Sequence, residues 1–176
     1  KNQTYVSVGA VNARGIIQNN DLDRYNFSVR NTTSMLNDKL TMDLSFMYSN
    51  VKEQNMLSQG EYANPLVPVY LFPRGDDFSK YQYYERYDVD RNIKTQFWPL
   101  KENGLSMQNP YWITNRNMYT NKKDRFLASG SLKYTITDWL NVSGRVKLDK
   151  ETINSEKKMY ASTLNVIAEN SDKGAY

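Results

Sequence analysis

Hydrophobic and polar residues alternate along five stretches of the chain. In the clearest stretch, 40–51, the apolar residues Leu40, Met42, Leu44, Phe46 and Tyr48 alternate with mostly polar ones. A β-strand turns successive side chains to opposite faces, so this period of two predicts a strand with one apolar face. The same pattern predicts strands near 4–12, 24–36, 125–136 and 140–149. Helical spacing of apolar residues is not sustained in any of them.

The connections between these expected strands are alternately short and long. Asn37-Asp38-Lys39 and Thr137-Asp138-Trp139 are tight turns, whereas 52–123 is a very long loop. Loops of that length are unusual in compact soluble domains. Outer-membrane barrels, in contrast, combine short periplasmic turns with long extracellular loops. We therefore expect 52–123 to be an extracellular loop.

The polar faces of these strands carry charged residues: Arg24, Arg30, Asp43, Lys133, Arg145 and Lys147. At the bilayer midplane each charge would cost about 2–4 kcal/mol, so we expect these residues to face the barrel lumen. A soluble antiparallel sheet with one wet face shows the same alternation. Strand length favours the membrane, because a tilted transmembrane strand needs about 9–11 residues.

The expected fold is therefore all-β, an antiparallel transmembrane β-barrel segment of about five strands with one long extracellular loop. Residues 1–176 would form part of an outer-membrane β-barrel domain. The smallest such barrels have about eight strands, so we expect the remaining strands to come from elsewhere, as in a longer parent protein.

Composition removes several classes of function. The chain has no cysteine and no histidine, which excludes thiolate nucleophiles, Ser-His-Asp triads and the usual zinc sites. We expect no enzyme activity, no catalytic residue, no metal and no cofactor. The 23 Lys and Arg residues are scattered among 19 Asp and Glu, a pattern that argues against a nucleic-acid partner. No leader and no helix-length apolar run is recognised in the sequence.

Three passages resemble a known family. The first is Tyr5-Val6-Ser7-Val8-Gly9 with Gly15-Ile16-Ile17-Gln18-Asn19-Asn20 and Arg24-Tyr25-Asn26. The second is Asn64-Pro65 with Tyr70-Leu71-Phe72-Pro73-Arg74-Gly75-Asp76-Asp77. The third and most specific is Asn109-Pro110-Tyr111-Trp112-Ile113-Thr114-Asn115-Arg116-Asn117, followed by Asp124-Arg125-Phe126, Tyr134-Thr135-Ile136-Thr137-Asp138-Trp139-Leu140 and Gly144-Arg145. Together they resemble the SusC/RagA-type TonB-linked (TonB-dependent) outer-membrane transporters, over nearly the whole chain up to about Asp149.

The resemblance implies a nutrient importer in the bacterial cell outer membrane. Such transporters take up glycans or oligopeptides, contact outer-membrane lipid and work with a SusD-like lipoprotein over the extracellular mouth. The TonB complex energises them through a plug domain, which is not recognised in this sequence. The chain would correspond to the early part of the barrel, just after the plug domain.

Aromatic residues of the expected loop are candidates for contact with the substrate or the lipoprotein lid: Trp98, Tyr111, Trp112, Tyr83 and Tyr84. The alternative, which we favour, is that they pack the loop on itself or on the lid. Tyr48, Tyr134 and Trp139 stand near strand ends, where an interfacial aromatic girdle is expected.

Two other classes of function stay open at this stage. One is a soluble β-sandwich that acts as a carbohydrate-binding module through exposed Tyr and Trp residues. The other is a glycoside hydrolase fragment or a calcium loop, using the carboxylates Asp76, Asp77, Asp88 and Asp90. Asp88-Val89-Asp90 matches only a small part of a calcium-binding loop.

Overall fold

The computed structural model describes residues 1–56, 60–99 and 107–176, and the parts of the expected loop at 57–59 and 100–106 lie outside them. The chain is mostly β-structure. It divides into two compact units, each of which is described by itself. The sheet unit comprises 1–13, 22–52 and 122–154, and the loop unit comprises 14–21, 53–121 and 155–176.

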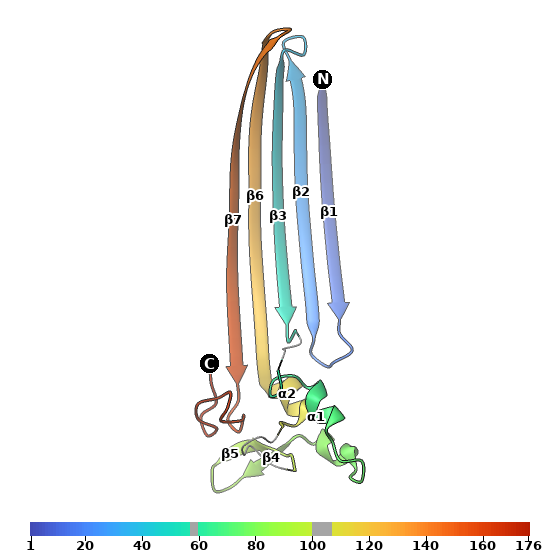
Figure 1. Ribbon diagram of the computed structural model, residues 1–176, viewed down its shortest axis with the longest axis vertical. Coiled ribbons are helices and arrows are strands. Elements are labelled where there is room, and N and C mark those ends of the chain that lie inside the picture. Colours follow the sequence, from blue (N-terminus) through green and yellow to red (C-terminus); the bar gives the residue numbers. More distant parts are fainter. Residues whose placement is uncertain (57–59, 100–106) are drawn as a thin grey trace. The chain divides into compact units, whose positions relative to one another are not determined.

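Five long strands form one antiparallel sheet, as the alternation predicted (Figure 1). They are β1 (Asn2–Arg14), β2 (Asp21–Met35), β3 (Leu40–Gln54), β6 (Asn117–Thr137) and β7 (Leu140–Met159). Their order is β1-β2-β3-β6-β7, so β1 and β7 each have one neighbour and the described sheet is open. A closed barrel is not formed by the described residues.

The strands run further than the alternation indicated, most of all β6 and β7. The expected ranges were 125–136 and 140–149, whereas the structure has 117–137 and 140–159. Most residues of the added segments are polar, so no alternation of apolar and polar residues marks them. Backbone pairing nonetheless continues there, as the 2.7 Å hydrogen bond from the Asn55 amide to the Tyr119 carbonyl shows. Pairing of the backbone, rather than amphipathicity, extends these strands.

Three consecutive residues have positive φ in the turn between β2 and β3. Leu36, Asn37 and Asp38 have φ of 54°, 56° and 66°. The Lys39 amide closes the turn by donating to the Leu36 carbonyl at 3.2 Å. Asn and Asp enter this region more readily than most residues, which favours a tight turn here.

The interval expected as a loop contains short elements. They are α1 (Leu66–Tyr70), the 3-10 helix η1 (Phe78–Gln82), β4 (Glu85–Asp88), β5 (Ile93–Gln96) and α2 (Pro110–Arg116). Strands β4 and β5 form an antiparallel hairpin. Helix α2 begins because the Asn109 side chain accepts from the Tyr111 amide and Pro110 occupies the first turn. None of the helices in the described ranges is long and apolar enough to cross a bilayer.

The segment after β7 is part of the loop unit. Met159 and Ala175 form an antiparallel bridge, with the two amides donating to each other's carbonyls at 2.8 and 2.9 Å. Leu164 and Ala168 are fully buried. Sequence patterns did not indicate this arrangement, because residues 160–176 carry no alternation.

Candidate functional site

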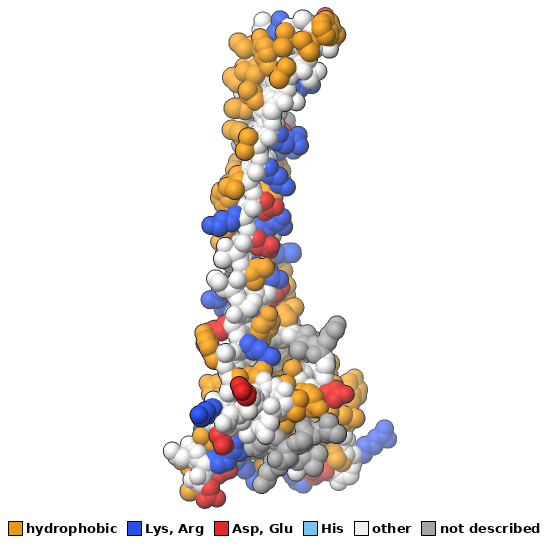
Figure 2. All heavy atoms as spheres, turned by 60° about the vertical axis from the view of Figure 1, so that its left-hand side comes forward, with side chains coloured by type: hydrophobic (Ala, Val, Ile, Leu, Met, Phe, Trp, Pro, Cys, Tyr) orange, Lys and Arg blue, Asp and Glu red, His pale blue; other side chains and the backbone are white. Residues whose placement is uncertain are grey.

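One face of the sheet carries a continuous apolar surface. Phe46 lies at its centre, with ring centroids 6.1 Å from Phe27 and 4.9 Å from Phe126. A shallow groove beside it is lined by apolar residues of four strands, among them Val29, Leu44, Phe46, Ala128, Val146 and Leu148. No second layer covers this face in the described part of the chain, and Val146 is 77% exposed. Figure 2 shows hydrophobic side chains gathered along one side of the sheet.

Polar residues limit the apolar surface at two opposite corners of this face. On β1 and β2, Asn31 donates to the side-chain oxygens of Asn2 and Thr4 at 2.7 and 2.8 Å. On β3 and β6, the limit is Asp124, whose Oδ1 accepts from the side chains of Tyr48 and Asn50 at 2.7 Å each.

Because these two corners are polar, the apolar surface crosses the strands diagonally. On β6 and β7 it reaches the turn at Trp139, whereas on β1 and β2 it ends before the corresponding end of the strands. A sheet whose strands stood perpendicular to the apolar band would not show this offset.

Aromatic residues with polar groups stand at the margins of the apolar surface. The Tyr25 hydroxyl accepts from the Asn12 amide group at 3.1 Å, and the Tyr48 hydroxyl donates to Asp124. At the turn end of the sheet, Tyr134 and Trp139 are exposed. The aromatic girdle expected for Tyr48, Tyr134 and Trp139 stays a prediction, and Tyr48 lies within β3 rather than at its end.

The opposite face is polar and partly paired. Arg30 donates to both carboxylate oxygens of Asp43, and Arg125 does the same to Asp149, with Nε to Oδ1 distances of 3.0 Å. The Ser45 and Ser129 hydroxyls are 2.7 Å apart on this face. Strand alternation places the other lumen candidates, Arg24, Lys133, Arg145 and Lys147, on the same face. Arg145 also acts electrostatically on Asp43.

Trp98 and Trp112, two of the candidate ligand contacts, lie in the interior of the loop unit. Trp98 is 7% exposed and Trp112 is 1% exposed. Trp98 belongs to an aromatic cluster with ring contacts among Phe72, Phe78, Tyr81, Phe97, Trp98 and Tyr111. Both tryptophans therefore pack the loop on itself, as the alternative to ligand contact predicted. A ligand arriving from the surface has no stacking face on either of them.

The three candidate tyrosines differ in exposure. Tyr83 is 82% exposed. Tyr84 is half-buried, with its ring centroid 6.5 Å from Trp112 and 6.0 Å from the Arg116 guanidinium carbon. Tyr111 is also half-buried, against Phe78 at 5.9 Å. Of the five candidates, Tyr83 alone offers most of its ring to a ligand or partner.

A buried polar network, which the sequence did not indicate, holds the loop unit together. Asn109 is fully buried, and its side-chain amide donates to the Tyr81 and Phe97 carbonyls at 2.8 and 2.9 Å. Gln108 and Gln96 are buried as well, and Gln96 donates to the Ser162 carbonyl at 2.8 Å. Buried amides need such partners to offset their lost hydration. The Asn-Pro pair at 109–110 was visible as a motif, but its partners are distant in the sequence.

Arg116 and Glu85 form an enclosed ion pair of the loop unit, with both side chains about four-fifths buried. Arg116 donates from Nε to Glu85 Oε2 at 2.7 Å, and its guanidinium carbon is 4.8 Å from the Tyr160 ring centroid. Burial alone would raise the pKa of Glu85. The hydrogen bonds from Lys94 and Arg116 outweigh burial, so the pKa lies below its ordinary value. This pair joins α2 to the β4–β5 hairpin.

The loop carboxylates Asp76, Asp77 and Asp88 accept hydrogen bonds from nearby backbone amides and so stabilise local turns. Asp76 Oδ1 accepts from the Asp77 amide at 2.8 Å and Oδ2 accepts from the Tyr81 hydroxyl, which lowers the pKa of Asp76. Asp77 accepts from the Ser79 hydroxyl and amide, which lowers its pKa too. Asp88 accepts from the amides of Asp90 and Arg91 at 3.1 Å. Among the described residues, no group of three or more acidic side chains is placed to hold a metal ion.

Comparison with known proteins does not assign the chain to a family. No protein-family model matches the chain, and a search of curated proteins finds no similar sequence.

Proposed function

We propose that the sheet is a wall segment of an outer-membrane β-barrel, with its apolar face toward lipid and its polar face toward the lumen. The chain then acts as part of a TonB-dependent, SusC-like importer of glycans or oligopeptides, with a SusD-like lipoprotein as partner. Energy reaches it through the TonB complex and a plug domain elsewhere in the transporter.

The diagonal apolar surface with aromatic margins carries this proposal. Strands of outer-membrane barrels are tilted by about 35–45° to the barrel axis. A band of lipid-facing residues parallel to the membrane must then cross the strands obliquely. The offset between Asn31 at one corner and Asp124 at the other fits that requirement.

A soluble carbohydrate-binding β-sandwich, the alternative, requires a second sheet against the apolar face. The described residues supply none, because β4 and β5 form only a two-stranded hairpin within the loop unit. A sugar-binding module would also need exposed aromatic rings. Of the five aromatic residues singled out in the sequence, Trp98 and Trp112 are buried and offer no ring face for a sugar to stack on. The barrel wall therefore accounts for more of the observations.

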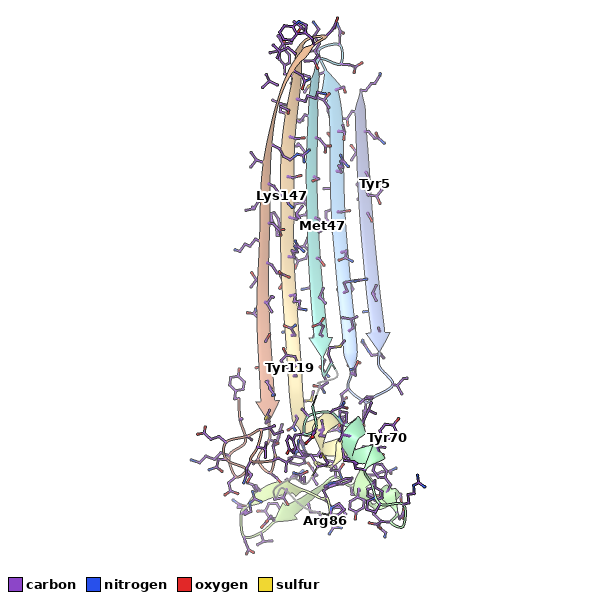
Figure 3. The ribbon with its side chains drawn as sticks, in the orientation of Figure 1. Tyr5, Met47, Tyr70, Arg86, Tyr119 and Lys147 are labelled. Atoms are coloured by element: carbon purple, nitrogen blue, oxygen red, sulfur yellow. The ribbon has the colours of Figure 1, made fainter. Side chains whose placement is uncertain are left out.

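The SusC-like part of the proposal is supported by the sequence passages and by one surface. Helix α1, within the second passage, leaves apolar side chains exposed, namely Leu66, Val69 and Tyr70, followed by Leu71. Tyr70 is 85% exposed and projects from the helix (Figure 3). An apolar surface on a helix in the loop unit suits contact with a lid protein.

The test is to isolate the intact protein that contains this sequence from its source membranes. We expect a denatured mass several times 20.6 kDa, extraction only with detergent, and slower migration after boiling, as barrels show on unfolding. Deleting TonB should abolish uptake of the cargo without removing the protein from the membrane. A 20.6 kDa polypeptide in the soluble fraction would overturn the proposal and favour the sugar-binding module.

A further inference from the structure

A cavity of about 480 Å³ lies within the loop unit. Its walls come from segments that are distant in the sequence, among them the turn between β1 and β2, helix α2, the start of β6 and the end of β7. Ile113 and Met159 are buried, whereas Met56 is 42% exposed, so the cavity reaches from the interior of the unit to its surface. Sites for small molecules typically have volumes of about 300–1,000 Å³.

The apolar lining of the cavity is mostly aliphatic. Its larger members are isoleucines and methionines: Ile17, Met56, Ile113, Met118, Met159 and Ile167. Tyr119 is the one aromatic residue among the described residues that line it. Methionine side chains are flexible and polarizable, so they adapt to an aliphatic chain. A sugar ring, in contrast, stacks on flat aromatic faces, of which this lining offers one.

The polar side chains of the lining are largely engaged with the protein itself. Asn55 donates from Nδ2 to the Thr114 carbonyl at 3.3 Å, and its Oδ1 accepts from the Tyr119 amide at 2.8 Å. Asn117 Oδ1 accepts from the Thr163 hydroxyl at 2.8 Å. These side-chain amides therefore stabilise the walls of the cavity and offer a ligand little further hydrogen bonding.

Lys157, near the end of β7, differs from the other lining residues in its charge. It is the only charged residue among the described residues that line the cavity, and it is exposed. Its neighbour Glu156 pairs with Lys158, and within the described ranges Lys157 forms no ion pair. A lysine packs its aliphatic stem along apolar surface and keeps its ammonium group in water. The cavity therefore combines an aliphatic lining with one cation at its solvent-exposed edge.

We infer that this cavity binds an amphiphile with one aliphatic chain and one anionic group, such as a medium-chain fatty carboxylate. The chain packs against the isoleucine and methionine side chains, which is favourable because apolar surface is removed from water. The carboxylate accepts a charge-assisted hydrogen bond from the Lys157 ammonium group. This inference goes beyond the proposed transport function, since every described lining residue belongs to the loop unit and the site does not require the sheet to face lipid.

The experiment follows the ¹³C-labelled methionine methyl groups of the intact protein, purified in a neutral detergent, by NMR. Decanoate is the probe, and decanol is its uncharged counterpart. Decanoate should shift the methyl signals of the three cavity methionines, Met56, Met118 and Met159. The signal of Met47, on the polar face of β3, should stay unchanged. Met42 lies on the apolar face of β3, so shifts there without shifts at the cavity methionines would mean that the probe only enters the detergent, and would overturn the inference.

Three variants test the chemistry of the site. Lys157→Gln should bind decanoate about tenfold more weakly, because the charge-assisted hydrogen bond is lost, and should bind decanol as the wild type does. Lys173→Gln removes an exposed cation of the same unit that is not part of the cavity lining, and should leave both affinities unchanged. Ala63→Phe places a ring in the cavity and should abolish binding of both probes.

The two lysine variants decide the outcome even if Ala63→Phe does not fold. Unchanged decanoate affinity in Lys157→Gln would overturn the inference, because the anionic group would then have no specific partner. An equal loss of affinity in Lys157→Gln and Lys173→Gln would overturn it as well, since general charge would explain binding. None of these results bears on whether the sheet spans a membrane, so the proposed transport function stands or fails separately.

Discussion

The sheet unit and the loop unit differ in how far they bury their hydrophobic residues. In the loop unit, Trp112 and Leu164 are almost completely enclosed, and buried amides such as Asn109 find partners inside. In the sheet unit, Val146 and Leu148 remain more than half exposed although they belong to a continuous apolar face. The loop unit carries its own core, whereas the sheet is a single layer in the part of the chain that the structure describes, and its apolar face is left uncovered there. In the proposed barrel wall, lipid covers the apolar face of the sheet and the aqueous lumen solvates its polar face.

The largest effect is expected from removing the core of the loop unit. Trp112→Ala should lower the free energy of unfolding of that unit by about 3–5 kcal/mol, because a fully buried indole leaves a large cavity. Amide hydrogen exchange of segments 107–121 and 160–176 in the intact protein measures the loss. Tyr83→Ala, at an exposed position, is the control and should change it by less than about 0.5 kcal/mol. Equal effects of the two variants would contradict the division into core and surface.

A charge on the apolar face should be the next most damaging change. Phe46→Lys is expected to cost about 2–4 kcal/mol of folding free energy in lipid vesicles, because the ammonium group faces hydrocarbon. Met47→Lys places the same charge one residue along β3 on the polar face and should cost far less. Urea titration of the intact protein in vesicles gives both values. If Met47→Lys were as costly as Phe46→Lys, the two faces would not differ as described.

The fold was readable from the sequence where side chains alternate, and less so elsewhere. Leu40 to Tyr48 marked β3 because one face is apolar, whereas the polar residues 150–159 of β7 carried no such mark. The candidate site was only partly readable. Trp98 and Trp112 were recognised as important aromatics, but their burial depends on contacts with Phe72 and Thr163, which are distant in the sequence. Local patterns predict strands, while tertiary partners decide which aromatic residues reach the surface.

A smaller effect is expected at the turn that closes the loop unit. Gly174 has φ of +70°, and a Cβ there would lie 2.2 Å from the Met159 carbonyl oxygen. Gly174→Ala should therefore destabilise the Met159–Ala175 bridge by roughly 1–3 kcal/mol. Hydrogen exchange of residues 159–176 reports the change. Gly75→Ala is the matched control, since a Cβ at Gly75 would meet no atom within 4 Å, and a similar loss there would argue against a local clash.

The smallest effect concerns pH and the Glu85–Arg116 pair. The pKa of Glu85 is lowered in the folded protein, so the ionised carboxylate stabilises the loop unit above the ordinary glutamate pKa of 4.5. That contribution is lost as the pH falls through the folded-state pKa. Because Lys94 is largely exposed, we expect at most about 1 kcal/mol. Urea midpoints of the loop unit, followed by tryptophan fluorescence from pH 6 to strongly acidic pH, should show a steeper fall for wild type than for Glu85→Gln.

The most direct measurement of the central claim is a scan of spin labels along β3 in lipid vesicles. The chain has no cysteine, so a single cysteine introduced at each of positions 42 to 49 can be labelled uniquely within it. Even positions, which include Leu44 and Phe46, should be accessible to oxygen dissolved in lipid. Odd positions, which include Ser45 and Met47, should be accessible to a water-soluble nickel complex. Access of the nickel complex to both sets of positions, or exclusion of both reagents from the even set, would contradict a lipid-facing sheet.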